Sequence, residues 1–361
     1  MQKRRIFIAA LTFKIVFMAG SVCLGQVLEN NSQQGKPANS SSLHKGTAVV
    51  ITGAASRIPQ EAALLEQLCE SGWLNDVAFI SGASSGALNT VVLNAILNKT
   101  FSWERYKKIL FGITNSQVYE RGDKKLPLNT QPLGNLLRRI VQDTLGYSVI
   151  GDLPFPSAMS ATRIKLVPPE KQTMRFSNKL INAESNPAYN LVDVLMASAA
   201  IPLVFPPVRI RNVDDFPEET FLDGGISDDH IPFEAVLQYQ RLRGNEVERL
   251  IIVSRKSDSV QNIQDELASI GLKDSKVLEK LGITLQRYSK DSFVKKLLEL
   301  QQLYPALALR TYIYVPDFDS NYPLLNFNTM KDQYRVTSAW AKQNQPVLLS
   351  EYLRENKVPK E

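Results

Sequence analysis

Cysteine and histidine are scarce in this sequence, with two of each among 361 residues. Cys23 lies in an apolar N-terminal stretch and Cys69 in a predicted helix, so a chain that loses its N-terminus keeps one thiol and forms no internal disulfide framework. His44 lies in a polar stretch outside the predicted folded domain. His230 is therefore the one histidine available as a catalytic base.

The excess of positive charge is confined to the N-terminus. The formal net charge is +6, but the first 25 residues contain four basic and no acidic side chains. The rest of the chain has 38 basic residues, which is the total of 42 less these four, against 36 acidic ones. No basic block with interleaved aromatic residues follows, so we expect no nucleic-acid partner.

Residues 1–25 are typical of an export signal. Lys3, Arg4 and Arg5 precede an apolar run that ends in small residues before Gln26. An uncleaved membrane anchor over residues 6–25 is the alternative, because a bilayer span needs about 20 apolar residues. Residues 26–46 are polar and predict a disordered tether. We expect a secreted or periplasmic protein with its folded domain at 47–356.

Apolar runs of strand length alternate with helical patterns along the folded part. Strands are predicted at 47–52, 77–81, 162–169, 173–178, 219–222, 248–254 and 311–316. Helices are predicted at 59–72, 86–98, 101–111, 132–145, 191–200, 274–303 and over most of 329–355. Such alternation is typical of a three-layer α/β/α sandwich around a mostly parallel sheet.

Two strand–glycine–helix turns offer either a phosphate cradle or a nucleophile elbow. A dinucleotide cradle needs a third glycine at the helix start, where the first turn has Arg57 and Pro59 and the second has Leu88. None of the twelve tyrosines has a lysine four residues later, as short-chain dehydrogenases require. We therefore expect no nucleotide and no cofactor.

The second turn fits a nucleophile elbow. Gly82-Ala83-Ser84-Ser85-Gly86 reads G-x-S-x-G directly between a predicted strand and a predicted helix. The glycines relieve clashes across so tight a turn, while the serine adopts a strained backbone conformation. The N-terminus of the following helix favours negative charge at this point.

The segment "FLDGGISDDH" supplies the candidate bases. Asp223 is followed by Gly224 and Gly225, which allow close backbone approach, although such a tripeptide is most often an ordinary turn. His230 follows in the Ser–Asp–His order of α/β-hydrolases, but it lies too close to Asp223 for that fold. Its alternative place is the mouth of the site. Asp228 and Asp229 are interpreted as solvated loop acids, and no metal site is expected.

Three segments together resemble the patatin-like phospholipases. "ISGASSGALN" is similar to the family's nucleophile segment, "FLDGG" to its acid segment, and "ASAAIPLVFPPV" (197–208) to the stretch between them. The resemblance implies a lipid acyl hydrolase with a Ser–Asp dyad, in which Ser84 attacks a lipid ester and Asp223 is its base. It also implies an α/β/α fold and a substrate presented at a membrane surface, and we expect no metal or cofactor.

The sequence departs from the family in the oxyanion loop, which is usually G-G-G-x-R-G. Here Gly53, Ala54, Ala55, Ser56 and Arg57 are followed by Ile58. Alanine keeps its N–H, so these residues still offer oxyanion donors, but a positive φ at an alanine is strained. A catalytically silent domain that binds lipid or protein is therefore the alternative.

Two neighbouring features belong to the same site hypothesis. Arg57 is expected to order the oxyanion loop, although a surface arginine at a helix start is the alternative. The polar segment 112–131 is either a lid over the site or an ordinary surface loop.

Overall fold

The computed structural model describes residues 46–121, 126–166, 169–210, 219–226, 228–244, 247–269 and 285–356. The expected export signal and all of the expected tether except Gly46 lie outside these residues and stay predictions. Within the described ranges no helix is long and apolar enough to cross a membrane.

The described strands form one mixed sheet of nine strands in the order β5-β6-β3-β2-β1-β7-β8-β9, with β4 paired to β3. The pairs that join β3, β2, β1, β7 and β8 are all parallel, and the antiparallel pairs lie at the margins. The strands are β1 Thr47–Ile51, β2 Val77–Ala83, β3 Ser157–Leu166, β4 Pro169–Ser177, β5 Val208–Ile210, β6 Glu219–Asp223, β7 Arg249–Val253, β8 Thr311–Tyr314 and β9 Val347–Leu348.

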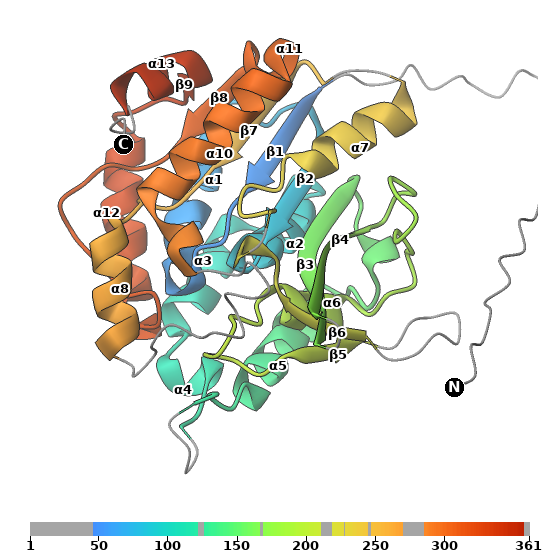
Figure 1. The fold of residues 1–361 in the computed structure, drawn as a ribbon, viewed down its shortest axis with the longest axis vertical. Coiled ribbons are helices and arrows are strands. Elements are labelled where there is room, and N and C mark those ends of the chain that lie inside the picture. The colour runs from blue at the N-terminus through green and yellow to red at the C-terminus, as the bar shows by residue number, and fades with distance from the viewer. Residues whose placement is uncertain are drawn as a thin grey trace, which may run out of the picture. The chain divides into compact units, whose positions relative to one another are not determined.

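The helices flank both faces of this sheet (Figure 1). The α-helices are α1 Ile58–Glu70, α2 Ser85–Leu97, α3 Trp103–Gly112, α4 Asn115–Val118, α5 Gln131–Arg138, α6 Leu191–Ser198, α7 Glu234–Arg243, α8 Val260–Ser269, α10 Lys290–Leu303, α11 Pro305–Ala308, α12 Met330–Ala341 and α13 Leu349–Glu355. Short 3-10 turns are η1 Ala55–Arg57, η3 Ile150–Asp152, η4 Gly224–Ile226, η5 Leu285–Tyr288 and η6 Phe327–Thr329, and η2 Arg139–Thr144 is a π-helical turn.

The central strand β1 shows why the fold has three layers. Ala48 and Val50 pack with apolar residues of α7, α10 and α13 on one face of the sheet. Val49 and Ile51 pack with α1, α2 and α12 on the other. All four side chains are fully buried, so β1 has no solvent face, as expected for a central parallel strand. The predicted α/β/α sandwich is confirmed.

One predicted helix is interrupted. The pattern predicted a helix over 274–303, of which 274–284 lies outside the described residues. Residues 285–288 form η5, and α10 begins only at Lys290. Ser289 ends the turn by capping α10, because its Oγ accepts the N–H of Ser292 at 3.2 Å. The continuous helix was therefore a wrong prediction at 285–289.

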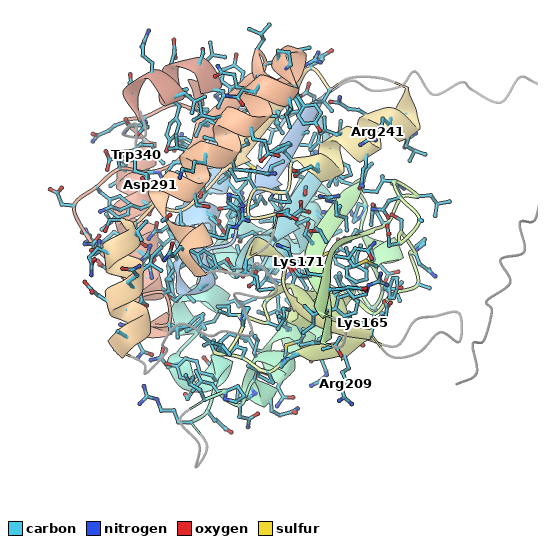
Figure 2. The ribbon with its side chains drawn as sticks, viewed as in Figure 1. Lys165, Lys171, Arg209, Arg241, Asp291 and Trp340 are labelled. Carbon is cyan, nitrogen blue, oxygen red and sulfur yellow. The ribbon has the colours of Figure 1, made fainter. Side chains whose placement is uncertain are left out.

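The two neighbouring aspartates differ in a way that the sequence did not predict. Most charged side chains are expected at the surface, as those of Lys165, Arg209 and Arg241 are (Figure 2). Asp228 is likewise exposed, whereas Asp229 is fully buried. The Asp229 carboxylate accepts two hydrogen bonds from Arg175, at 2.7 and 2.6 Å, and one from Ser160 Oγ at 2.7 Å. Its interpretation as a solvated loop acid was wrong.

Replacing these aspartates tests the difference. Asp229→Ala leaves the Arg175 cation largely buried without its partner, so we expect a loss of about 3 kcal/mol in the free energy of unfolding. The matched variant Asp228→Ala is expected to change it by less than about 0.5 kcal/mol. Urea unfolding measures both, and equal effects would contradict the structural role of Asp229.

Candidate active site

Ser84 lies at the turn between β2 and α2 with an uncommon backbone conformation. Its φ is 55° and its ψ is −129°, a region that non-glycine residues rarely occupy. The surrounding structure holds this strain, because the Ser84 N–H donates to Ser198 Oγ at 2.8 Å and that hydroxyl donates to the carbonyl of Ser160 at 2.6 Å. The Ser84 side chain is 3% exposed.

The motif glycines are required by close backbone approach. A β-carbon on Gly82 would overlap the carbonyl oxygen of Gly86, and one on Gly86 would overlap the carbonyl oxygens of Ile51 and Thr52 at the end of β1. These contacts place the first turn of α2 directly against the segment that continues into Gly53.

Asp223 ends β6 and is fully buried. Its N–H donates to the carbonyl of Ala200 at 2.9 Å, and its Oδ1 accepts the N–H of Gly225 at 2.6 Å. Gly224 leaves no room for a side chain, because a β-carbon there would overlap the carbonyl oxygen of Ser160. Backbone contacts therefore fix the position of the carboxyl group.

Ser84 and Asp223 both lie near Gly53. A β-carbon built on Gly53 would lie 2.9 Å from Ser84 Cβ and 3.6 Å from Ser84 Oγ. One built on Gly225 would lie 3.1 Å from Asp223 Oδ1 and 3.9 Å from Gly53 Cα. The fold thus brings together three segments that are far apart in the sequence.

Burial controls the ionisation of Asp223. Loss of solvation raises its pKa to about 7, while the Ser84 hydroxyl, the Gly225 N–H and the Tyr288 hydroxyl act in the opposite direction. Among the described residues, Oδ2 has no partner in hydrogen-bonding geometry. The two hydroxyls therefore lie near enough to the Asp223 carboxyl group to lower its pKa, without hydrogen-bonding geometry at Oδ2.

Hydrogen bonds show which backbone N–H groups of the predicted oxyanion loop, Gly53 to Arg57, already have an acceptor. The N–H groups of Ala54, Ser56 and Arg57 donate to Ser85 Oγ, Leu324 O and Ala54 O at 2.8, 2.9 and 2.8 Å. Within the part of the chain that the structure describes, the N–H groups of Gly53 and Ala55 have no such acceptor. Of the five predicted oxyanion residues, these two therefore retain available donors.

The Arg57 side chain is buried and ties this loop to the C-terminal part of the chain. Its Nε donates to the carbonyl of Tyr322 at 2.6 Å, and its guanidinium forms an ion pair with Asp258. Ser56 Oγ donates to the carbonyl of Pro323 at 2.7 Å. These contacts match a role for Arg57 in ordering the loop.

His230 is also buried, and its Nε2 lies 3.3 Å from the carbonyl oxygen of Ser292 in α10. Its predicted place at the site mouth stays a prediction. Sequence reasoning missed Tyr288, a buried residue from η5 that interacts electrostatically with Asp223. No motif marks this tyrosine, because it comes from a part of the chain without a recognisable active-site segment.

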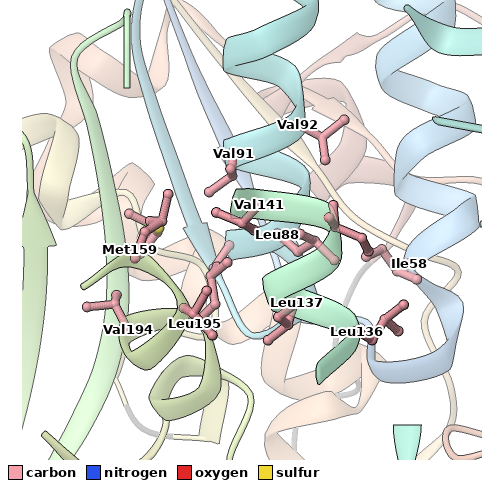
Figure 3. Packing of buried hydrophobic residues seen from close by; sticks show 14 of the residues in the cluster. Ile58, Leu88, Val91, Val92, Leu136, Leu137, Val141, Met159, Val194 and Leu195 are labelled. Carbon is pink, nitrogen blue, oxygen red and sulfur yellow. The ribbon is translucent and has the colours of Figure 1, made fainter. Parts of the chain in front are cut away.

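An apolar cavity of about 70 Å³ reaches Ser84. Of the described residues that line it, all except Ser84 and Ser85 are apolar. Figure 3 shows part of the hydrophobic cluster to which many of these lining residues belong, between α1, α2, α5 and α6. The segment 112–131 contributes Ile113 and Val118 to the lining, while its role as a lid stays a prediction. The lining includes Ile58, Leu88, Leu133, Leu136, Leu195 and Phe205.

A strand–serine–helix elbow of this kind is the arrangement by which α/β hydrolases expose a nucleophile. A model of the family described as patatin-like phospholipase matches residues 49–237, which are 189 of the 361 residues. The chain belongs to the patatin-like phospholipase family, and this membership supports a lipid hydrolase function.

Comparison with solved structures finds similar chains at low identity. VipD from Legionella pneumophila is 12% identical with a TM-score of 0.35, over 89% of this chain and 72% of that one. Human GIVD cytosolic phospholipase A2 is 10% identical with a TM-score of 0.39, over 90% and 64%. The type III effector protein ExoU is 13% identical with a TM-score of 0.32, over 88% and 54%. No curated protein matches the sequence.

Ala55 carries the strain that the altered loop predicted, with a φ of 47°. Ala55→Gly is expected to increase the free energy of unfolding by about 0.5–1 kcal/mol, because relief of the left-handed conformation outweighs the added chain entropy. Urea unfolding measures the change.

Ala54 provides the matched control, because its φ of −132° suits any residue and its side chain is fully buried. Ala54→Gly is therefore expected to destabilise the protein by about 0.5–1 kcal/mol. Equal destabilisation by the two glycine variants would show that the backbone of Ala55 is not strained.

Proposed function

We propose that this protein hydrolyses carboxylic esters of lipids through an acyl-enzyme formed on Ser84. The observation that carries the proposal is the position of Ser84, between a buried Asp223 and a cavity with an apolar lining. The apolar lining suits an acyl chain, because burial of each CH₂ group from water contributes about 0.8 kcal/mol. The ester carbonyl would then lie at the serine hydroxyl.

In the first step, Ser84 Oγ attacks the ester carbonyl carbon while its proton moves to the Asp223 carboxylate. The N–H groups of Gly53, Ala55 and Ser85 are the donors that we assign to the negatively charged oxygen. Collapse of the tetrahedral intermediate breaks the bond to the alcohol, which takes the proton from Asp223. A water molecule then repeats the sequence on the acyl-enzyme and releases the fatty acid.

We further propose that a phospholipid presented at a membrane surface is the substrate. Family membership and the apolar cavity support this choice.

A silent lipid-binding domain is the second candidate, and the strained Ala55 favours it. A fluorophosphonate probe distinguishes the two, because it labels a serine only when that serine is nucleophilic. Labelling of Ser84 supports the enzyme. Phospholipid binding without labelling or hydrolysis supports the silent domain.

The proposed dyad predicts how activity depends on side chains and pH. Ser84→Ala and Asp223→Asn are each expected to lower kcat/KM by about 10³-fold or more. Asp223 is a base only when ionised, and its pKa is about 7, so kcat/KM is expected to fall as the pH drops below about 7. Hydrolysis of p-nitrophenyl butyrate from pH 5 to 9 measures both effects. Activity that survives in Asp223→Asn would rule out the dyad.

The cavity predicts a preference that depends on acyl chain length. Leu133 lines the cavity and is half-buried, so Leu133→Trp is expected to narrow it at little cost in stability. Activity on a palmitoyl ester should fall about tenfold or more relative to a butyryl ester.

Leu145 supplies the control, because it packs on the same core without lining the cavity. Leu145→Trp is expected to keep the ratio of long-chain to short-chain activity. An unchanged ratio in Leu133→Trp as well would place the acyl chain elsewhere.

A further inference from the structure

Tyr288 brings a third hydroxyl to Ser84 and Asp223. A β-carbon built on Gly53 would lie 3.5 Å from Tyr288 Cε1 and 3.6 Å from Ser84 Oγ. One built on Gly225 would lie 3.7 Å from the Tyr288 hydroxyl oxygen and 3.1 Å from Asp223 Oδ1. The tyrosine therefore faces both members of the proposed dyad.

Two buried polar atoms meet here without the partners that burial normally requires. Within the described residues, neither the Tyr288 hydroxyl nor Asp223 Oδ2 has a partner in hydrogen-bonding geometry. Asp223 Oδ1 already accepts the N–H of Gly225. Burial of a polar group without a hydrogen-bond partner is unfavourable, so a hydrogen bond between the Tyr288 hydroxyl and Asp223 Oδ2 would stabilise both groups.

The tyrosine is fixed from the opposite side by Arg255. The Arg255 guanidinium donates to the Tyr288 carbonyl at 2.8 Å, and its Cζ lies 5.4 Å from the centroid of the tyrosine ring. The ring packs against Leu222 and Ile226, which flank Asp223 in the sequence. Contacts to the backbone carbonyl and to the ring thus fix the tyrosine, whose hydroxyl lies near Asp223.

We propose that Tyr288 is a positioning residue, whose hydroxyl donates to Asp223 Oδ2 and keeps this carboxylate ionised and aimed at Ser84. This inference rests on the proposed function. A carboxylate oxygen has two lone pairs, so Oδ2 can accept the tyrosine hydroxyl and the Ser84 proton in turn. Tyr288 keeps its own proton throughout.

The electrostatics agree with this role. Burial and the negative charge of Asp223 raise the pKa of Tyr288 well above its usual value, which keeps the hydroxyl protonated as a donor. Among the described residues, the charged groups near Tyr288 and Asp223 are Arg255, which lies at the tyrosine ring, and Asp258, which forms ion pairs with Arg57 and Arg255. On β3, Thr162 Oγ1 donates to the backbone carbonyl of Asp223 at 3.1 Å and adds no charge.

Tyr288→Phe removes the hydroxyl and keeps the ring. The acid limb of the kcat/KM profile is expected to move up by about one pH unit, because loss of a hydrogen bond to the charged form favours protonated Asp223. Activity should therefore fall about tenfold at pH 6 and much less at pH 9, with KM changed less than about twofold.

Tyr314→Phe is the matched control, since this buried tyrosine on β8 donates to the carbonyls of Ala341 and Asn344. It is expected to lower stability and leave the acid limb in place. Site-specific 3-fluorotyrosine at position 288 provides a second test that preserves packing. Its more acidic hydroxyl is a stronger donor, so the acid limb should move to lower pH.

The outcomes separate this inference from the proposed function. If wild type hydrolyses the ester with Ser84 and the acid limb is the same in Tyr288→Phe, the role of Tyr288 is overturned while the dyad stands. A uniform loss at every pH would indicate a merely structural role and also overturn it. If Tyr288→Phe does not fold, the fluorotyrosine protein decides: an acid limb of its kcat/KM profile at the same pH as in wild type overturns the inference. Wild type without Ser84-dependent hydrolysis or labelling overturns both proposals.

Discussion

The first turn of α2 lies so close to the end of β1 that no side chain fits between them. Gly86 meets the carbonyls of Ile51 and Thr52, and the parallel register pairs Ile51 with Gly82. This contact fixes where α2 begins and forces Ser84 into its positive-φ conformation. It also places Gly53, the next residue after Thr52, beside the serine. The proposed nucleophile and the proposed oxyanion donor Gly53 are therefore positioned by one close contact between backbone segments rather than by separate side chains.

A buried polar network stabilises this contact between the end of β1 and α2. Thr52 Oγ1 donates to Glu61 at 3.1 Å and lies 2.8 Å from Ser254 Oγ, while Asn89 in α2 donates to the other Glu61 oxygen at 3.2 Å. Tyr106 donates to Asn89 at 2.7 Å. Burial raises the pKa of Glu61 well above its usual range. A single acid from α1 thereby links the ends of β1 and β7 to α2, the helix that follows Ser84.

The parts of the site that sequence could predict are those whose geometry is local. A strand, a glycine turn and a helix within a few residues determine the conformation of Ser84, so G-x-S-x-G carries its own structure. The sandwich was predictable for a similar reason, because alternating apolar patterns give strands and helices in turn. For Ala55, the sequence predicted strain only if the loop required a positive φ there. Whether it does depends on the path of the loop, which no residue pattern specifies.

Long-range contacts account for what the sequence could not predict. Asp229 looks like its exposed neighbour in the sequence, and only the fold places Arg175 of β4 against it. Tyr288 and Arg57 likewise contact partners that lie far along the chain, at Asp223 and at Asp258 and Tyr322. The interruption of the helix at Ser289 could not be predicted, because the apolar spacing of α10 continues into η5. The helix begins anew there because the Ser289 hydroxyl accepts a backbone N–H group of the first turn of α10.

The position of β1 has a consequence for the order in which the molecule can form during synthesis. One neighbour of β1, the strand β2, is the next strand in the sequence. The other neighbour, β7, is not synthesised until the ribosome reaches residues 249–253. Until then β1 has an unpaired edge whose apolar side chains are completely covered in the finished protein. The loop beside Ser84 also lacks its anchors at Asp258 and Tyr322. In a ribosome-bound chain that already contains Ser84 and Asp223, the loop beside Ser84 therefore still lacks these contacts, and we expect the candidate site to form only after the C-terminal third has emerged.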